Sequence, residues 1–299
     1  MAKYSVTAST LNIRSSTSKQ DSSNIIGKIP FQHIVELIEQ TTPEWWKIEV
    51  TESGFVGYVS SQYLSPFIDE PIINNGIREA NFLPDSKANL NSKHMMHKPI
   101  GDSTIPFRDL TDTASKINSI KQLINKLNVE TSLRYQKTEK NTFCNIYAYD
   151  YCYFCLVYIP RVWWTEKAIK SLLQGQNVEI LYGNTVSELN ANALHDWLLN
   201  WAVDFGWQRF FNTDEFQNKI NSNGGVGIIC AKRKDTRRSG HIVAVVPEND
   251  TQKAFRQNGL VLFPLQSQAG ANNYNYFSDK KKDWWVGSQF SSFVFYYHE

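Results

Sequence analysis

The sequence of 299 residues predicts an α+β protein with two domains, a small all-β domain followed by a larger one. Short runs of alternating apolar and polar residues, separated by turn residues, fill residues 4–67. From residue 108 onwards, segments with helical spacing come first and β-rich segments follow. Because 41% of the residues are apolar and 13% are aromatic, the chain has enough hydrophobic material to form a folded core.

Charge and hydropathy exclude two classes of protein. The net charge is only +2, so we expect no nucleic-acid binding. No run of about 18 apolar residues occurs, so we expect no membrane span. Residues 1–7 lack the apolar core of a signal peptide, which predicts a chain that is made in the cytoplasm and does not use the general secretory route.

Residues 1–67 are predicted to form the first domain, with strands at 4–8, 34–38, 46–50 and 57–59. The segments 11–15, 26–29, 45–48 and 54–59, in this order, resemble a bacterial SH3 domain. One departure is that Gln32 and His33 stand where the family often has a glycine. The resemblance implies an SH3-like β-barrel that binds cell-wall peptide or packs beside a catalytic domain. The alternative is a packing module without a ligand.

Residues 68–107 are predicted to be a linker that wraps the next domain, because prolines punctuate a polar stretch with little periodicity. The second domain is expected at 108–299 and begins with a helix at 108–128, capped by Thr111 or Asp112. Further helices are predicted at 144–156, 190–204 and 214–223. An antiparallel sheet follows, with strands at 226–231, 240–247, 259–265 and 290–297.

A cysteine opens the second of these helices, in the segment Thr142-Phe143-Cys144-Asn145-Ile146-Tyr147. A helix N-terminus offers unpaired backbone N–H groups and a partial positive charge, and both favour the nucleophilic thiolate. The same N–H groups can hold the oxyanion of an acyl-transfer intermediate. Cys144 is therefore the candidate nucleophile, with a buried structural cysteine as the alternative. Cys152 and Cys155 form a CxxC pair in an aromatic run and are predicted to be core residues.

The candidate base is His241, which follows Gly240 and begins the β-rich run 241–246. A nucleophile and its base are commonly delivered by two separate elements of a fold. The alternative is a core histidine that is bonded to a polar partner. His195, near the start of the helix predicted at 190–204, is the rival base. The remaining histidines are poorly placed: His33, His94, His97 and His298.

A third group usually orients the imidazole of such a base, and the next predicted strand carries two glutamines. The amide oxygen of either glutamine can accept a hydrogen bond from the imidazole. Gln268 is preferred because it ends the strand beside Ala269 and Gly270. Gln266 is the second choice and Glu248 is a weaker alternative.

Residues 132–299 resemble the catalytic domain of NlpC/P60 and CHAP-type cysteine peptidases, which cut peptidoglycan. The segments that carry the resemblance are 142–150, 188–192 with Trp197, 205–207, 240–246 and 268–270. The resemblance implies a papain-like α+β domain with Cys144 as nucleophile, His241 as base and Gln268 as the third member. We expect no metal and no cofactor, and the sequence has neither an HExxH motif nor a glycine-rich phosphate loop.

Three further residues are predicted to bind substrate. Asn145 follows the nucleophile, and Trp163 and Trp164 belong to a segment that is richer in aromatics than is usual in the family. The two indoles are expected to form a wall of the substrate groove, with local packing as the alternative. The basic run 232–238, just before His241, is predicted to be a solvated loop. Its alternative role is to meet carboxylates of stem peptides or anionic wall polymers.

The sequence thus predicts a cysteine hydrolase that cleaves an amide bond in peptidoglycan stem peptides. Peptidoglycan is the expected partner. An export or lysis apparatus, or an immunity protein, would accompany a chain that reaches the cell wall without a signal peptide, as a lysis protein or an injected effector. The alternatives are a catalytically silent wall-binding adaptor and a Cys–His toxin protease or deamidase that acts on protein. Endopeptidase and amidase activities need the same residue pair, so the sequence leaves the bond open.

Overall fold

The computed structural model describes residues 2–6, 8, 10–30, 33–51, 54–66, 76–82, 100–278 and 283–299. The chain divides into two compact units, Met1–Pro71 and Ile72–Glu299. The predictions for Gln32, His94, His97 and most of the linker lie outside the described residues. Within the described residues, no helix combines the length and the apolar character that crossing a membrane would need.

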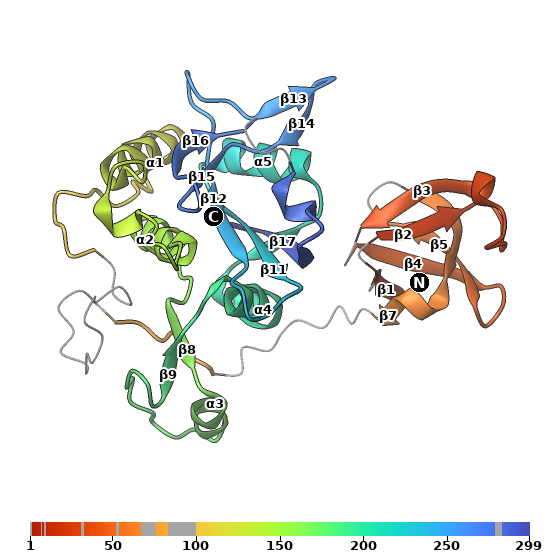
Figure 1. The fold of residues 1–299 in the computed structure, drawn as a ribbon, viewed down its shortest axis with the longest axis horizontal. Helices are drawn as coiled ribbons and strands as arrows, with labels where there is room; N and C mark the ends of the chain where they lie inside the picture. Colours follow the sequence, from red (N-terminus) through yellow and green to blue (C-terminus); the bar gives the residue numbers. More distant parts are fainter. Residues whose placement is uncertain are drawn as a thin grey trace. The chain divides into compact units, whose positions relative to one another are not determined.

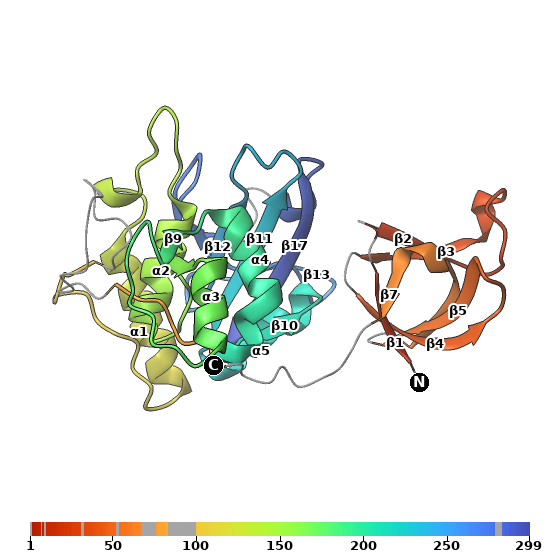
Figure 2. The same ribbon diagram turned by 90° about the horizontal axis from the view of Figure 1, so that it is seen from below.

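The first unit is a seven-stranded antiparallel sheet that curls around its own core (Figure 1, Figure 2). The strands lie in the order β3-β2-β6-β5-β4-β1-β7. Their bounds are β1 (Lys3–Val6), β2 (Thr10–Arg14), β3 (Ile25–Pro30), β4 (Ile34–Gln40), β5 (Trp45–Val50), β6 (Phe55–Ser60) and β7 (Leu64–Pro66). Inward-pointing residues form the core, namely Val6, Leu11, Ile13, Ile29, Val35, Ile48, Val50 and Val59. The predicted small β domain is confirmed.

The second unit has a six-stranded antiparallel sheet in the order β10-β17-β11-β12-β15-β16 (Figure 1). These strands are β10 (Gln208–Phe210), β11 (Val226–Arg233), β12 (His241–Val245), β15 (Gln266–Gln268), β16 (Tyr274–Phe277) and β17 (Phe290–His298). Two small two-stranded antiparallel sheets lie outside it: β8 (Val162–Trp164) pairs with β9 (Val186–Glu188), and β13 (Phe255–Gln257) pairs with β14 (Leu260–Phe263). The α-helices are α1 (Thr113–Leu127), α2 (Cys144–Phe154), α3 (Glu166–Leu173), α4 (Ala191–Trp201) and α5 (Thr213–Asn223). The predicted α+β class with an antiparallel sheet is confirmed.

The central strands β11 and β12 are buried on both faces over residues 226–231 and 242–245, which explains why these stretches carry no polar side chain other than the thiol of Cys230. Successive side chains of a strand point to opposite faces. Ile242 and Ala244 join the larger core with α2 and α4, whereas Val243 and Val245 pack with Phe216 of α5. The sheet is therefore a middle layer, with the helix that begins at Cys144 on one face.

The helix ends follow capping rules, with one exception. The N-cap side chains of α1, α4 and α5 are Asp112, Asn190 and Asn212, each of which accepts a hydrogen bond from a backbone N–H three residues later. Thr165 does the same for α3. The residue before α2 is Phe143, which has no capping side chain. Among the described α-helices, α2 alone therefore starts without a side-chain cap.

Two of the differences from the sequence prediction have a clear physical cause. The segment 259–265 was predicted as one strand, but β14 ends at Phe263 and β15 begins at Gln266. Pro264 lies between them, and proline supplies no N–H donor to a ladder, so the strand breaks there. The two-stranded sheet of β8 and β9 was not predicted, because its pairing joins residues far apart in the sequence, such as Trp163 and Ser187.

The described parts of the predicted linker pack against the second unit. Ile77, Ala80, Phe82 and Ile105 are buried and belong to the core of that unit. The backbone N–H of Ala80 donates to the hydroxyl of Tyr158 at 3.0 Å. The described segments 76–82 and 100–107 thus form part of the surface layer of the second unit.

Candidate active site

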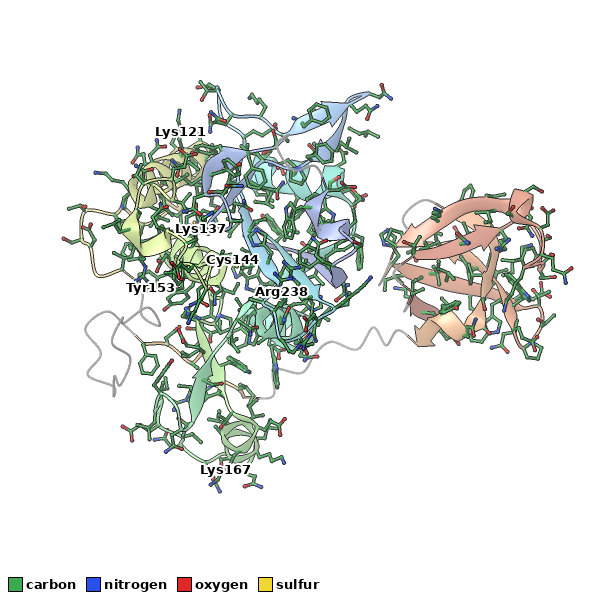
Figure 3. The ribbon with its side chains drawn as sticks, viewed as in Figure 1. Lys121, Lys137, Cys144, Tyr153, Lys167 and Arg238 are labelled. Carbon is green, nitrogen blue, oxygen red and sulfur yellow. The ribbon has the colours of Figure 1, made fainter. Side chains whose placement is uncertain are left out.

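Cys144 is the first residue of α2, and its side chain lies beside the start of β12 (Figure 3). The residue is only 3% exposed. Burial raises the pKa of the Cys144 thiol, and backbone N–H groups of Ile242, Asn145 and Cys144 act in the opposite direction. The N–H groups of Cys144 and Asn145 are available because α2 has no side-chain cap at this end, and that of Ile242 comes from β12. The protonated thiol is therefore the expected resting form of Cys144.

The side chain of Asn145 makes two hydrogen bonds at the N-terminus of α2. Its amide oxygen accepts from the backbone N–H of Ile146 at 3.1 Å, and its amide nitrogen donates to the carbonyl of Leu189 at 2.8 Å. These bonds tie the first turn of α2 to the residue just before the cap of α4. They leave the N–H groups of Cys144 and Asn145 directed towards the sulfur.

His241 is the first residue of β12 and pairs with Ala231 of β11. Its ring nitrogen Nε2 lies 2.7 Å from Oε1 of Gln268. Gln268 is buried, and its amide nitrogen donates to the carbonyl of Asn272 at 3.0 Å. Because that bond fixes the amide orientation, Oε1 must accept the hydrogen bond and Nε2 of His241 must carry the proton. In the neutral imidazole the basic nitrogen is then Nδ1.

The three residues of the predicted catalytic set come from three neighbouring elements. The N–H of Ile242, next to His241, acts on the sulfur of Cys144, and His241 bonds to Gln268. Tyr147 of α2 and Ser267 of β15 also join their hydroxyls by a hydrogen bond. The helix that carries the cysteine is thus fixed to the strand that carries the orienting amide.

The two alternatives to Gln268 have other partners. The amide oxygen of Gln266 accepts from the indole N–H of Trp284 at 2.8 Å. The carboxylate of Glu248 accepts from both terminal nitrogens of Arg256, at 2.6 and 2.8 Å, and from the backbone N–H of Ala254. Of the three candidates, Gln268 is the one that is hydrogen-bonded to His241.

The rival base His195 lies on α4 and is 1% exposed. Its Nδ1 lies 3.2 Å from Asp196 and its Nε2 lies 3.0 Å from the hydroxyl of Ser292 on β17. Burial lowers the pKa of His195 to about 4, although Asp196 acts in the opposite direction. His195 is therefore a neutral imidazole that joins α4 to the sheet.

A pocket of about 290 Å³ lies beside the imidazole of His241. Trp284 forms one wall, with its ring edge-on to the imidazole at a centroid distance of 4.7 Å. Residues that line the pocket include Thr142, Gly240, His241, Gln268, Trp284 and Phe290. The pocket gives a ligand access to the His241–Gln268 pair.

Comparison with known proteins assigns only the N-terminal part. Residues 9–65 match the family model described as a bacterial SH3 domain. No curated protein matches the chain. Among solved structures, NlpC2 from Trichomonas vaginalis is similar at 11% identity and a TM-score of 0.22, over 92% of this chain and 69% of that chain. A TM-score of this size does not establish a shared fold, so the assignment of the site rests on its geometry.

Gly240 sets the entry of the chain into β12. A Cβ atom at this position would lie 2.2 Å from the carbonyl oxygen of Ala231 and 2.7 Å from Oδ1 of Asn192. Asn192 in turn accepts from the backbone N–H of Arg233 at 2.9 Å and donates to the carbonyl of Arg238 at 2.9 Å. A side chain at residue 240 would push His241 away from its present place.

The structure does not bring Trp163 and Trp164 to this pocket. Both are buried on β8, with 6% and 3% exposure. Trp163 packs in an aromatic cluster with Tyr158, Trp197, Trp201 and Phe205. Trp164 donates its indole N–H to the carbonyl of Arg78 at 2.7 Å. The packing that was the alternative to a groove wall accounts for both residues in this state.

The other cysteines are core residues. Cys152, Cys155 and Cys230 are fully buried and not in disulfides, and burial raises the pKa of Cys155 to about 12. The thiol of Cys230 donates to the carbonyl of Ala191 at 3.3 Å. Within the described parts of the chain, no cluster of three or more His, Cys, Asp or Glu side chains is arranged to hold a metal ion.

For Trp284 the sequence leaves ligand stacking and core packing as equal alternatives, and the structure places it at the wall of the pocket. Its indole is held by Gln266 and contacts the ring of His241. A signal was present, because Gln266 and Gln268 are two apart on one strand and so share a face. Two buried amides on one face need two polar partners, and the imidazole of His241 satisfies only one of them.

Proposed function

We propose that the second unit is a cysteine hydrolase that cleaves an amide bond in peptidoglycan stem peptides. The observation that carries the proposal is the 2.7 Å hydrogen bond between His241 and Gln268, next to the uncapped helix start that holds Cys144. A core histidine needs only a polar partner. His241 has more than that: a fixed tautomer, a neighbouring cysteine and an open pocket. Nucleophilic catalysis needs these three features together.

In the proposed reaction, Nδ1 of His241 removes the proton of the Cys144 thiol while the sulfur attacks the amide carbonyl carbon. Backbone N–H groups at the start of α2 stabilise the oxyanion that forms. The intermediate collapses, the C–N bond breaks and His241 returns the proton to the leaving amine. Water then attacks the thioester, with His241 again as base, and releases the acid and the thiol. Gln268 keeps the imidazole in the required tautomer throughout.

The similarity of residues 9–65 to bacterial SH3 domains supports a cell-wall substrate. In the first unit, a pocket lined by Asn12, Lys19, Trp45, Gln62 and Tyr63 offers polar and aromatic contacts for an extended peptide. Such a unit would hold the polymer while the second unit cleaves it. This division of labour raises the effective concentration of the scissile bond.

The proposal is tested with purified sacculi and the full chain. We expect the wild-type protein to release soluble muropeptides and Cys144→Ala to release none, with an unchanged circular dichroism spectrum. Mass spectrometry of the fragments identifies the bond, because an endopeptidase leaves a split stem peptide and an amidase leaves a free sugar lactyl group. Equal release by Cys144→Ala would sink the proposal. Equal activity on a panel of proteins would favour a protein substrate.

A second candidate function is favoured by one observation, the 3% exposure of Cys144. A thiol that stays buried would make the unit a catalytically silent wall-binding protein. Alkylation with iodoacetamide at neutral pH separates the two functions. A catalytic Cys144 is modified faster than Cys152, Cys155 and Cys230, and the rate falls in His241→Ala. A silent unit shows no such preference.

A further inference from the structure

The pocket beside His241 has an unbalanced charge. Among its described lining residues, Arg233 is the only side chain with a permanent charge, and no acidic side chain is present. The polar remainder is neutral, including Gln268, Gln289 and Ser239. A pocket of this kind favours an anionic group over a neutral or cationic one.

Arg233 ends β11 and pairs with Phe290 of β17 in the sheet. Its guanidinium carbon lies 5.3 Å from the centre of the Phe290 ring, and its Nε donates to the carbonyl of Ser239 at 3.2 Å. These two contacts hold the plane of the guanidinium. Neither terminal nitrogen has a hydrogen-bond partner among the residues that the structure describes.

The neighbouring cations of the same basic run are arranged differently. The ammonium of Lys232 bonds to both carboxylate oxygens of Asp196 at 2.7 Å. Arg237 is paired with Asp235 at 2.9 Å, and its side chain is 90% exposed. Arg237 therefore fits the interpretation of this run as a solvated loop. Arg233 does not fit it, because Arg233 lines the pocket.

The walls around Arg233 strengthen its interaction with an anion. Trp284 and Phe290 contact each other with ring centroids 5.7 Å apart, and Gln266 holds the indole N–H of Trp284. Fixed aromatic walls displace water and lower the local dielectric, so a charge-assisted hydrogen bond is worth more here than on an open surface.

We propose that this pocket is a carboxylate-binding subsite, in which the terminal nitrogens of Arg233 bind a carboxylate carried by the residue next to the scissile amide. The planar fork of a guanidinium matches the two oxygens of a carboxylate. The inference rests on the proposed function, since it places the carboxylate relative to the bond that Cys144 and His241 would cleave. It narrows the substrate to peptides with an acidic group beside that bond.

The test measures binding without catalysis, in the full-length Cys144→Ala protein with ¹⁵N-labelled indoles. Trp284→Phe in the same background identifies the indole signal of Trp284 among those of the nine tryptophans. N-acetyl-glutamate is the anionic probe, and N-acetyl-glutaminamide is its neutral counterpart. We expect the acid to shift the Trp284 signal to saturation and the diamide to leave it unchanged.

Arg233→Gln is expected to weaken the apparent affinity for N-acetyl-glutamate about tenfold or more, as the loss of a charge-assisted hydrogen bond predicts. Arg237→Gln is the matched control, since it removes the same charge from the same run without touching the pocket, and it should keep the wild-type affinity. Equal shifts with both probes, no saturable shift with the acid, or an unchanged affinity in Arg233→Gln would each overturn the subsite. The proposed function is tested separately, by comparing muropeptide release by the wild-type protein and by Cys144→Ala. Failure of the subsite and failure of the proposed function are therefore distinguishable.

Discussion

Two histidines of the second unit sit in opposite settings on the same sheet. His241 begins β12, is partly exposed to a pocket and faces the amide of Gln268. His195 is enclosed between α4 and β17, with Asp196 on one nitrogen and Ser292 on the other. The comparison teaches that a hydrogen bond to an imidazole does not by itself indicate a catalytic role. His241 differs from His195 in two ways: a ligand can reach it through the pocket, and Cys144 lies beside the strand that carries it.

The largest effect is expected from removing each imidazole in turn. His241→Ala should lower kcat/KM for muropeptide release about 10³-fold or more, because general-base catalysis is lost, and should change the free energy of unfolding little. His195→Ala should do the reverse, with activity per folded molecule retained and the free energy of unfolding lowered by about 2 kcal/mol. Turnover assays and urea denaturation of both variants check this. An inactive but stable His195→Ala protein would contradict the assignment.

Acid should destabilise the protein through His195. Its pKa is lowered to about 4 from an ordinary value of 6.5, so between these values the unfolded chain binds a proton that the folded chain does not. The free energy of unfolding therefore falls as the pH drops from about 6.5 to about 4, by up to about 3 kcal/mol from this group. Urea denaturation across this range should give a flatter curve for His195→Gln. A slope that is the same in both proteins would rule out His195 as its source.

Replacing the orienting amide should have an intermediate effect. Gln268→Ala is expected to lower kcat about 10- to 100-fold, because the imidazole loses its fixed tautomer and position. Gln268→Glu should restore orientation and move the acid limb of the pH–rate profile to higher pH, since a carboxylate stabilises the imidazolium. Steady-state kinetics over pH measures both. A Gln268→Ala protein with full activity and an unchanged pH profile would show that His241 needs no orienting partner.

The smallest effect is expected at the pocket wall. Trp284→Phe keeps an aromatic ring beside His241 but loses the hydrogen bond to Gln266, so KM should rise about threefold with kcat little changed. Trp285→Phe is the matched control, because Trp285 is buried in the core behind the wall. A larger change in kcat than in KM would mean that Trp284 positions the imidazole rather than the ligand.

The residues that could be predicted from sequence are those with a local signal. Cys144 stands at a helix start, His241 follows a glycine at the start of an apolar strand, and Gln268 ends the next strand. Each signal depends on backbone periodicity and on turn residues a few positions away. The choice among Gln268, Gln266 and Glu248 also depended on strand ends, and in the structure Gln268 is the one that pairs with His241.

The residues that could not be placed depend on contacts between distant segments. Nothing near Trp163 and Trp164 in the sequence indicates whether an aromatic pair lines a groove or fills a core. Burial of Trp163 is decided by Trp197 of α4 and by Phe205 in the short 3-10 helix that follows α4. Trp284, in contrast, lies at the pocket wall, and its position there depends on a hydrogen bond to Gln266 of β15. Aromatic content predicts burial on average and not the site of any one ring.

The glycine that precedes His241 has a consequence for how far this sequence can vary. A Cβ at Gly240 would meet the backbone of β11, and backbone cannot move aside as a flexible side chain can. Every amino-acid replacement at this position therefore introduces a clash beside His241, the proposed base, although residue 240 has no part in the proposed bond making. In a saturation library selected for activity, residue 240 should tolerate substitution as poorly as Cys144, the proposed nucleophile. In a second library selected only for folding, residue 240 should tolerate more substitutions. Comparing the two libraries would distinguish a position that must lack a side chain from one whose side chain takes part in the chemistry.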